Sequence, residues 1–420
     1  MVYIPRLVTF FAFVTAAFTL IRPRGGWGRL LLFIPKLFAG TFISFCGLTG
    51  LAGALLGWLI GRDWVSLFLG LGAAAVAAVH IYRIARRGLD SARDIAQEMP
   101  SPAPSPSKTM LPYPWVGSWP LPPEARWQVD VSIGVHPETG RPLLADLWSS
   151  ADPANRSGLG VIYLHGSGWH YADKDFGTRR FFRHLASQGH VVADVAYTLA
   201  PQADLFGMMG DVKRAVHWMK THAQDLGVDA GRIVLCGGSA GGQLALLAAY
   251  TPNHPRLDPA DVTGDTSVRG VISYYGPADL LAQYERFNEL PGLTERTAFE
   301  RMVMRALEVR FGFAVIPVHG LLPGFLGGTP AEVPELYALG SPCNHFGSHC
   351  PPTLLLQGTH DFSGAAPQVR RLQAALNKAG CTSFLLELPG ADHGFDLYKP
   401  RWSPAAQAAT YVTERFLASL

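Results

Sequence analysis

Two long runs without charge constrain this chain more than any other feature of its sequence. Residues 37–60 contain no charged side chain, and residues 64–82 form a second apolar run directly after Gly61-Arg62-Asp63. At a rise of about 1.5 Å per residue, helices of these lengths cross or nearly cross the hydrocarbon core of a bilayer. Because two adjacent uncharged runs of this length are uncommon as a buried helical pair in a soluble protein, the sequence predicts a transmembrane hairpin.

A shorter apolar run at residues 7–21 leaves several interpretations open. It could be a third transmembrane span, or a helix that lies in the membrane interface. Residues 1–25 could also form a cleaved signal peptide, although a single charge precedes the apolar run and no clear small-residue cleavage site follows it. We therefore predict that residues 1–98 form an anchoring region with two or three transmembrane helices.

Positive side chains flank the hairpin on both sides and predict its orientation. Lys and Arg favour the cytoplasmic side of a membrane. They precede the hairpin at Arg22, Arg24, Arg29 and Lys36 and follow it at Arg83, Arg86, Arg87 and Arg93. Both flanks should therefore face the cytoplasm, and the turn at Arg62 should lie outside. A third span would move only the N-terminus, so the chain after residue 83 is expected on the cytoplasmic side of a multi-pass membrane protein.

Charge and cysteine content exclude some classes of protein. Residues 1–98 carry ten Lys and Arg against four acidic residues, so the rest of the chain has a net charge of −3 within a total of +3. Nucleic-acid binding is not expected, since the excess positive charge flanks apolar runs. The five Cys and fourteen His show no metal-ligand spacing, so we expect neither a metal nor a cofactor. Cys343 and Cys350 could pair, but nothing in the sequence requires it.

Residues 99–125 separate the anchoring region from the rest of the chain. Nine prolines fall within residues 99–123, so the segment cannot form a helix or supply the donors of a sheet. We interpret it as an extended, semi-rigid linker. Its second half, with Tyr113, Trp115 and Trp119, could equally fold onto the following domain. That domain spans residues 126–420, and we expect its core not to require residues 1–98.

From residue 126 onward, strand-like and helix-like segments alternate. Residues 126–135 alternate apolar and polar side chains, and 141–148 follow as a hairpin partner. Near-continuous apolar strands come next, at residues 158–166, 190–197, 232–238, 268–276, 351–358 and 382–390. Helical spacing occurs at 207–223, 239–250, 365–379 and 404–419. Strands that are buried on both faces and alternate with helices predict an α/β fold with a mostly parallel sheet and flanking helices.

A Gly-x-Ser-x-Gly sequence joins one of these strands to a helix. Gly237, Ser239 and Gly241 lie between the strand at 232–238 and the apolar helix that follows. In such a turn the glycines let the strand and the helix approach each other, and the serine is exposed as a nucleophile beside a backbone amide. The alternative is an ordinary glycine-rich turn, which the strand–turn–helix context disfavours.

Other candidate catalytic groups also follow strands, where open α/β sheets place their sites. His393 follows the last strand and is the candidate base for Ser239. Asp361 follows the preceding strand and is the candidate acid that orients the imidazole. Asp392 is a rival acid by adjacency, and Asp279 is a weaker one because a helix N-cap explains it better.

Together these segments resemble the α/β-hydrolase family, in particular the hormone-sensitive-lipase-like bacterial esterases and lipases and their feruloyl/acetyl-esterase-like branch. The similar stretches occur in the family's order: HGSGW, GGSAGG, SYYGPADL, FLGGTPAEVPELYALGSP, PPTLLLQGTHD and LPGADHGF. The resemblance implies an α/β-hydrolase fold in which Ser239, Asp361 and His393 form a catalytic triad. It also implies cleavage of carboxylic esters without a cofactor or metal.

The oxyanion hole implied by the resemblance comes from backbone N–H groups of Gly166, Ser167, Gly168 and Ala240. The usual HGGG sequence is HGSG here, so the side chain of Ser167 could change the size of the acyl group that the site accepts.

An insertion at about residues 280–340 is expected to cover the site as a lid. Its apolar stretch at 311–328 could be plain core packing, an acyl channel or a membrane-facing surface. The leading hypothesis is a membrane-anchored serine esterase that acts on small-molecule or lipid-like esters and contacts the lipid bilayer. A thioesterase or transacylase with the same triad, and a non-catalytic membrane-anchored binding module with a hydrolase fold, are the alternatives.

Overall fold

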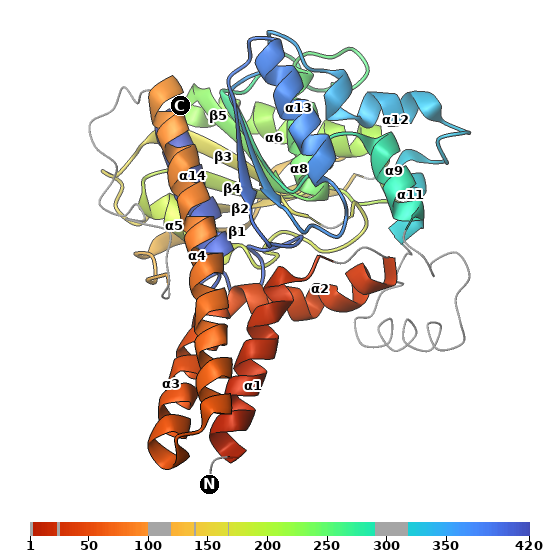
Figure 1. The fold of residues 1–420 in the computed structure, drawn as a ribbon. Helices are drawn as coiled ribbons and strands as arrows, with labels where there is room; N and C mark the ends of the chain where they lie inside the picture. Colours follow the sequence, from red (N-terminus) through yellow and green to blue (C-terminus); the bar gives the residue numbers. More distant parts are fainter. Residues whose placement is uncertain (1–2, 23–25, 100–118, 138–139, 167, 290–317) are drawn as a thin grey trace.

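The computed structural model describes residues 3–22, 26–99, 119–137, 140–166, 168–289 and 318–420. Most of the predicted linker, Ser167 and the middle of the predicted lid lie outside the described residues. In the described parts, a group of N-terminal helices stands below a sheet that is flanked by further helices (Figure 1).

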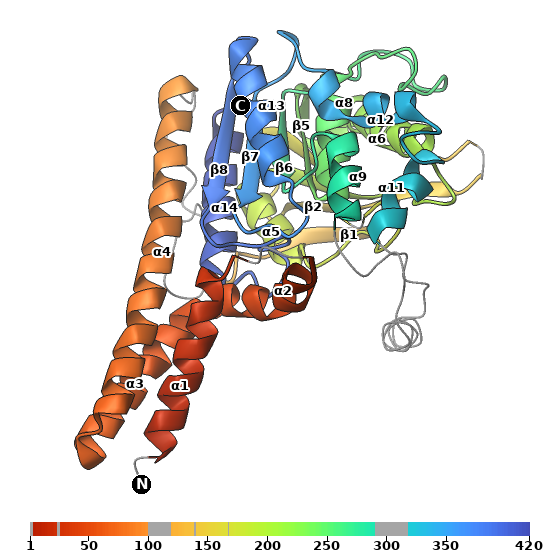
Figure 2. The same cartoon turned by 45° about the vertical axis from the view of Figure 1, so that its right-hand side comes forward.

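Three apolar helices form an N-terminal bundle. They are α1 (Tyr3–Ala17, continued by the short η1, Phe18–Leu20), α3 (Ile43–Gly61) and α4 (Trp64–Glu98), and they run side by side (Figures 1 and 2). By length and composition, each is apolar enough to cross a membrane. A methyl group added at Gly70 would lie 2.2 Å from the carbonyl oxygen of Gly50, so only glycine permits this approach of α4 to α3.

The boundaries of the predicted spans differ from those in the structure. The uncharged run at 37–60 is divided, because α2 (Gly26–Thr41) ends within it and Phe42 leaves the helical conformation before α3 begins at Ile43. Below the sheet, α2 lies across the end of the bundle (Figure 2). The run at 64–82 is extended, because α4 continues to Glu98. The helix extends because its second half packs against the sheet and its flanking helices, which together we call the sheet part (the described residues from 119 to 420).

The sheet has eight strands in the order β1-β2-β4-β3-β5-β6-β7-β8. The strands are β1 (Ala125–Val135), β2 (Pro142–Ser150), β3 (Gly158–Leu164), β4 (Val191–Ala196), β5 (Val228–Gly238), β6 (Gly270–Tyr274), β7 (Thr353–Gly358) and β8 (Ser383–Leu388). The pairings of β1 with β2 and of β2 with β4 are antiparallel, and all other pairings are parallel. The predicted mostly parallel α/β sheet is therefore confirmed.

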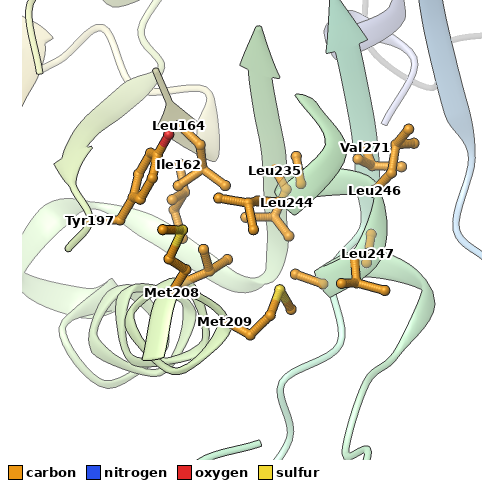
Figure 3. Packing of buried hydrophobic residues seen from close by; sticks show 14 of the residues in the cluster. Ile162, Leu164, Tyr197, Met208, Met209, Leu235, Leu244, Leu246, Leu247 and Val271 are labelled. Atoms are coloured by element: carbon orange, nitrogen blue, oxygen red, sulfur yellow. The ribbon is translucent and has the colours of Figure 1, made fainter. Parts of the chain in front are cut away.

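Helices cover both faces of the sheet. One face buries α6 (Leu205–Thr221), α8 (Ala240–Tyr250) and α13 (Ala366–Lys378) in the larger apolar core. Figure 3 shows part of this core, in which Met208 and Met209 of α6 lie near Leu244 and Leu247 of α8. The other face is covered by α14 (Pro404–Ala418), by α5 (Arg179–Ser187), which the sequence pattern did not predict, and by α4.

The second half of α4 belongs to the core of the sheet part. Ile84 and Ile95 are each 1% exposed and join the cluster that contains side chains of β3, β7 and α14. Trp119, at the end of the predicted linker, is also buried in this cluster, and its backbone N–H donates to the carbonyl oxygen of Arg401 at 2.8 Å. α4 thus supplies part of the core of the sheet part, and the expectation that this core does not require residues 1–98 stays a prediction.

The remaining described helices are short. They are α7 (Ala223–Leu226), α9 (Leu280–Asn288), α11 (Val318–Leu326), α12 (Pro334–Gly340) and the 3-10 turn η2 (Pro342–Asn344). Of these, α9, α11 and α12 belong to the predicted lid, whose residues 290–317 lie outside the described part of the chain. Cys343 and Cys350 are both free, so the pairing that the sequence left open does not form.

Candidate active site

Ser239 occupies a strained turn between β5 and α8. Its φ of 53° and ψ of −120° fall in a region that residues with a side chain rarely adopt. The flanking glycines make the turn possible. A methyl group at Gly237 would lie 2.4 Å from the carbonyl oxygen of Gly241, and one at Gly241 would lie 2.0 Å from that of Leu164. The Gly-x-Ser-x-Gly spacing thus corresponds to a close crossing of strand and helix that exposes the serine.

The structure brings together the three side chains expected to form a triad. His393 Nε2 lies 2.9 Å from Ser239 Oγ, and His393 Nδ1 lies 3.0 Å from Asp361 Oδ2. Because β5, β7 and β8 are parallel, the segments that follow them meet at one edge of the sheet. The three residues are separated in sequence but adjacent at this edge.

Asp361 is completely buried and held by hydrogen bonds that sequence reasoning missed. Its Oδ1 accepts from the backbone N–H and the hydroxyl of Ser363 at 2.8 and 2.6 Å, and its Oδ2 accepts from Gln357 Nε2 at 2.8 Å. Burial alone would raise the pKa of Asp361, but the imidazole of His393 and these donors lower it overall. The carboxylate is therefore kept ionised beside the imidazole.

The environment of His393 raises the pKa of its imidazole. Burial acts to lower this pKa, but the charge and the hydrogen bond of Asp361, together with Asp392 and Asp396, outweigh it. Tyr275 packs on the ring, with centroids 4.6 Å apart, and its hydroxyl donates to Asp396 Oδ1 at 2.6 Å. The surrounding carboxylates thus stabilise an imidazolium, which is the form that a base takes after it accepts a proton.

The two rival carboxylates have other partners. Asp392 Oδ1 accepts from the backbone N–H groups of Phe362 and His393, both at 2.9 Å, and its Oδ2 pairs with Lys36. Asp279 accepts from the backbone N–H of Ala282 and caps α9, as the N-cap interpretation expects. Of these acidic residues, Asp361 is the one whose oxygen contacts the imidazole of His393.

Backbone amides expected to form the oxyanion hole lie around Ser239. Gly166 is so close to the serine turn that a methyl group there would lie 3.1 Å from Ser239 Cβ. Gly168 has a φ of 58°, and Ala240 is the first residue of α8, where N–H groups have no partner within the helix. Ser167 lies outside the described residues, so the effect of its side chain stays a prediction.

An apolar cavity of about 280 Å³ adjoins Ser239 and His393. Trp169 forms part of its wall and is fixed by stacking on Phe325, with centroids 4.9 Å apart, and by donating from Nε1 to Gln243 at 2.9 Å. The rest of the lining is largely apolar and includes Tyr171, Phe176, Pro277, Phe287, Val318, Leu321, Phe362 and Leu397. Such a cavity suits the acyl or alkyl part of an ester.

The described residues of the predicted lid pack into the core and also line the cavity, whereas an acyl channel and a membrane-facing surface stay predictions. Leu322 and Phe325 of α11 are buried in the core, whereas Val318 and Leu321 of the same helix line the cavity. Phe287 of α9 also lines it. Within the described residues, no three His, Cys, Asp or Glu side chains are grouped so as to hold a metal ion.

Part of this chain matches a known family model, and about two thirds of it is similar to known relatives. The model of the BD-FAE family matches residues 147–308. Esterase LipQ of Mycobacterium tuberculosis is 30% identical over 278 residues, which cover 66% of this chain and 59% of LipQ. The probable carboxylic ester hydrolase LipM of the same organism is 28% identical over 293 residues, which cover 69% of this chain and 61% of LipM. The chain thus spans about 60% of the length of these relatives.

A solved structure agrees with this fold. The esterase Est2 of Thermogutta terrifontis, with propionate bound, superimposes with a TM-score of 0.50 at 23% identity, covering 70% of this chain and 94% of Est2. At this identity the similarity concerns the fold alone. The family model and the relatives thus support an esterase- and lipase-like family, and the solved structure supports an α/β-hydrolase-like fold.

Proposed function

We propose that this protein is a membrane-anchored serine hydrolase that cleaves carboxylic esters. The observation that carries the proposal is the continuous contact from Asp361 through His393 to Ser239 at the wall of an apolar cavity. The relatives named as esterases and as a carboxylic ester hydrolase support the same reaction.

The reaction follows from the roles of the three side chains. Ser239 Oγ attacks the ester carbonyl carbon while His393 Nε2 takes its proton. The developing oxyanion is stabilised by the N–H groups of Gly166, Gly168 and Ala240. The intermediate then expels the alcohol, which receives the proton from His393, and leaves an acyl group on the serine. Water, activated by the same imidazole, hydrolyses this acyl-enzyme and restores the hydroxyl.

The N-terminal bundle supports the membrane part of the proposal. Large apolar side chains such as Leu48, Leu59 and Phe68 are each more than 60% exposed on its surface, which favours lipid over water. The Lys and Arg side chains on both flanks of the α3–α4 hairpin favour a sheet part on the cytoplasmic side. Proteolysis of sealed, right-side-out vesicles should leave the sheet part intact, and its digestion there would contradict this topology.

A panel of esters with graded acyl length tests the proposed reaction. The purified full chain in detergent micelles should hydrolyse these esters, and Ser239→Ala should not. Release of free acid identifies water as the acceptor, whereas transfer to an added alcohol or thiol identifies a transacylase. Absence of turnover on every ester, in protein that is folded, would contradict the proposal and favour a non-catalytic binding module.

A further inference from the structure

The segment that carries His393 rests on the N-terminal helices. A methyl group at Gly390 would lie 3.1 Å from the carbonyl oxygen of Thr19 in η1. Farther along the same segment, Thr41 Oγ1 at the end of α2 donates to the carbonyl oxygen of Tyr398 at 3.4 Å. The segment that places His393 is therefore supported from the side of the bundle as well as from β8.

A buried ion pair also joins the two parts. Lys36 Nζ of α2 lies 3.1 Å from Asp392 Oδ2, and the two side chains are 1% and 2% exposed. The other oxygen of Asp392 accepts from the backbone N–H groups of His393 and Phe362, at 2.9 Å each. One carboxylate thus ties α2 to the loops that follow β7 and β8. Removal of one partner from such a pair leaves a buried charge without compensation.

A chain of aromatic contacts runs in parallel with this ion pair. Phe33 lies one turn before Lys36 on α2, and its ring centroid is 4.9 Å from that of Phe362. The ring centroid of Phe362 is in turn 5.5 Å from that of the His393 imidazole. Phe362 also lines the cavity beside Ser239. α2 therefore reaches the base through two sets of contacts, one ionic and one aromatic, which meet at Phe362.

From these contacts we propose that α2 is a working part of the active site, in which Lys36 is a positioning residue that holds the His393 loop through Asp392. The inference rests on the proposed esterase function and deepens it. The N-terminal region is then more than a tether, because the alignment of His393 with Ser239 depends on α2 being in place. The enzyme should lose turnover when α2 is disturbed, even on an ester that is dissolved in water.

The test compares variants of the full chain in detergent micelles on a water-soluble short-chain ester. Values of kcat are expressed per active site, counted by the endpoint of fluorophosphonate labelling, so that unfolded protein does not contribute. Lys36→Met should lower kcat roughly 10–100-fold, as expected for a catalytic group displaced on the order of 1 Å, and should change KM little. Adding Asp392→Asn to Lys36→Met should restore much of the lost kcat, because the amide oxygen still accepts the two N–H groups and no unpaired charge remains.

A matched control separates positioning from loss of stability. Lys213 of α6 is also completely buried and pairs with Asp258 at 3.1 Å, but α6 carries no residue of the cavity. Lys213→Met should lower the unfolding temperature and leave kcat per labelled site unchanged. A wild-type kcat for Lys36→Met, or an equal loss for Lys213→Met, would overturn the inference.

A second variant tests α2 if the Lys36 variant does not fold, and the wild-type chain itself tests the esterase function. If Lys36→Met does not fold, Phe33→Ala disturbs only the aromatic route, and it should still lower kcat severalfold without a matching change in KM. An unchanged kcat for Phe33→Ala would then contradict the role of α2. If the wild-type chain is neither labelled by the fluorophosphonate nor able to hydrolyse the ester, the proposed esterase function is wrong. If the wild type is active and the α2 variants are equally active, only the role of α2 is wrong.

Discussion

The two halves of α4 have opposite surroundings although they form one continuous helix. In the first half, Trp64 and Phe68 are 57% and 68% exposed, and they belong to the apolar surface of the bundle. In the second half, Ile84 and Ile95 are each 1% exposed and pack into the core of the sheet part. The boundary between the two parts therefore falls within a helix, and the bundle and the sheet part are joined by α4 as well as by the proline-rich segment.

The largest expected effect is the loss of kcat in Ser239→Ala, which tests whether the catalytic groups all lie in the sheet part. Ser239→Ala removes the nucleophile and should lower kcat roughly 10⁴–10⁶-fold, because what remains is substrate binding and oxyanion stabilisation. Steady-state hydrolysis of a soluble ester measures the loss, and Phe68→Ala on the exposed half of α4 is the control that should keep normal turnover. Substantial activity in the serine variant would assign the chemistry to another group.

Substitution of Asp361 and of Asp392 separates the catalytic role of one carboxylate from the positioning role of the other, which contacts α2. Asp361→Asn should lower kcat on the order of 10³–10⁴-fold, because the amide no longer stabilises the imidazolium and favours the wrong tautomer. Asp392→Asn should cost less, since this residue contacts Lys36 and the backbone rather than the imidazole. Both values come from kcat per labelled site, and a larger loss for Asp392→Asn would mean that the acid has been assigned to the wrong residue.

The two halves of α4 can be compared directly by truncation of one side chain in each. Ile95→Ala leaves a cavity in the shared core and should lower the free energy of unfolding by about 2–4 kcal/mol. Phe68→Ala removes a side chain from an exposed surface and should change this free energy by less than about 0.5 kcal/mol. Denaturant unfolding in detergent, followed by the fluorescence of the sheet part, measures both. Equal, small changes would mean that α4 does not contribute to that core.

The smallest expected effect is a shift in pH dependence. The pKa of His393 is raised above the usual value of about 6.5, chiefly by Asp361 acting against burial. Because only the neutral imidazole accepts the serine proton, kcat/KM should rise with pH through a midpoint above about 6.5 and then level off. Asp361→Asn removes the opposing negative charge, so its residual activity should show a midpoint at lower pH. A wild-type profile that is flat from pH 5 to 8, with chemistry limiting the rate, would exclude a histidine base.

The sheet and the groups at its edge could be predicted because their signals are local. A buried strand has a continuous apolar run, and Ser239, Asp361 and His393 each follow such a run within a few residues. The helix α5 was missed because it is short and rich in Arg, so its buried face consists of few residues, among them Phe182 and Leu185.

The link between the bundle and the active site could not be predicted because its partners are distant in sequence. Lys36 and Asp392 are separated by 356 positions, and nothing in either segment indicates that the other lies beside it. The sequence predicts Lys36 to be a charge that flanks a membrane span, whereas in the structure it is buried against Asp392. The same holds for α4, since Ile84 and Ile95 lie among polar residues and their apolar partners belong to the C-terminal part of the chain.

Mapping of a covalent adduct tests directly whether Ser239 is the nucleophile. The full chain in detergent micelles is treated with a fluorophosphonate, digested and analysed by tandem mass spectrometry. We expect one modified residue, Ser239, with labelling that is much slower in Asp361→Asn and slower, though complete, in Lys36→Met. An unlabelled wild-type chain that is folded, or an adduct on a residue other than Ser239, would contradict the assignment of this site.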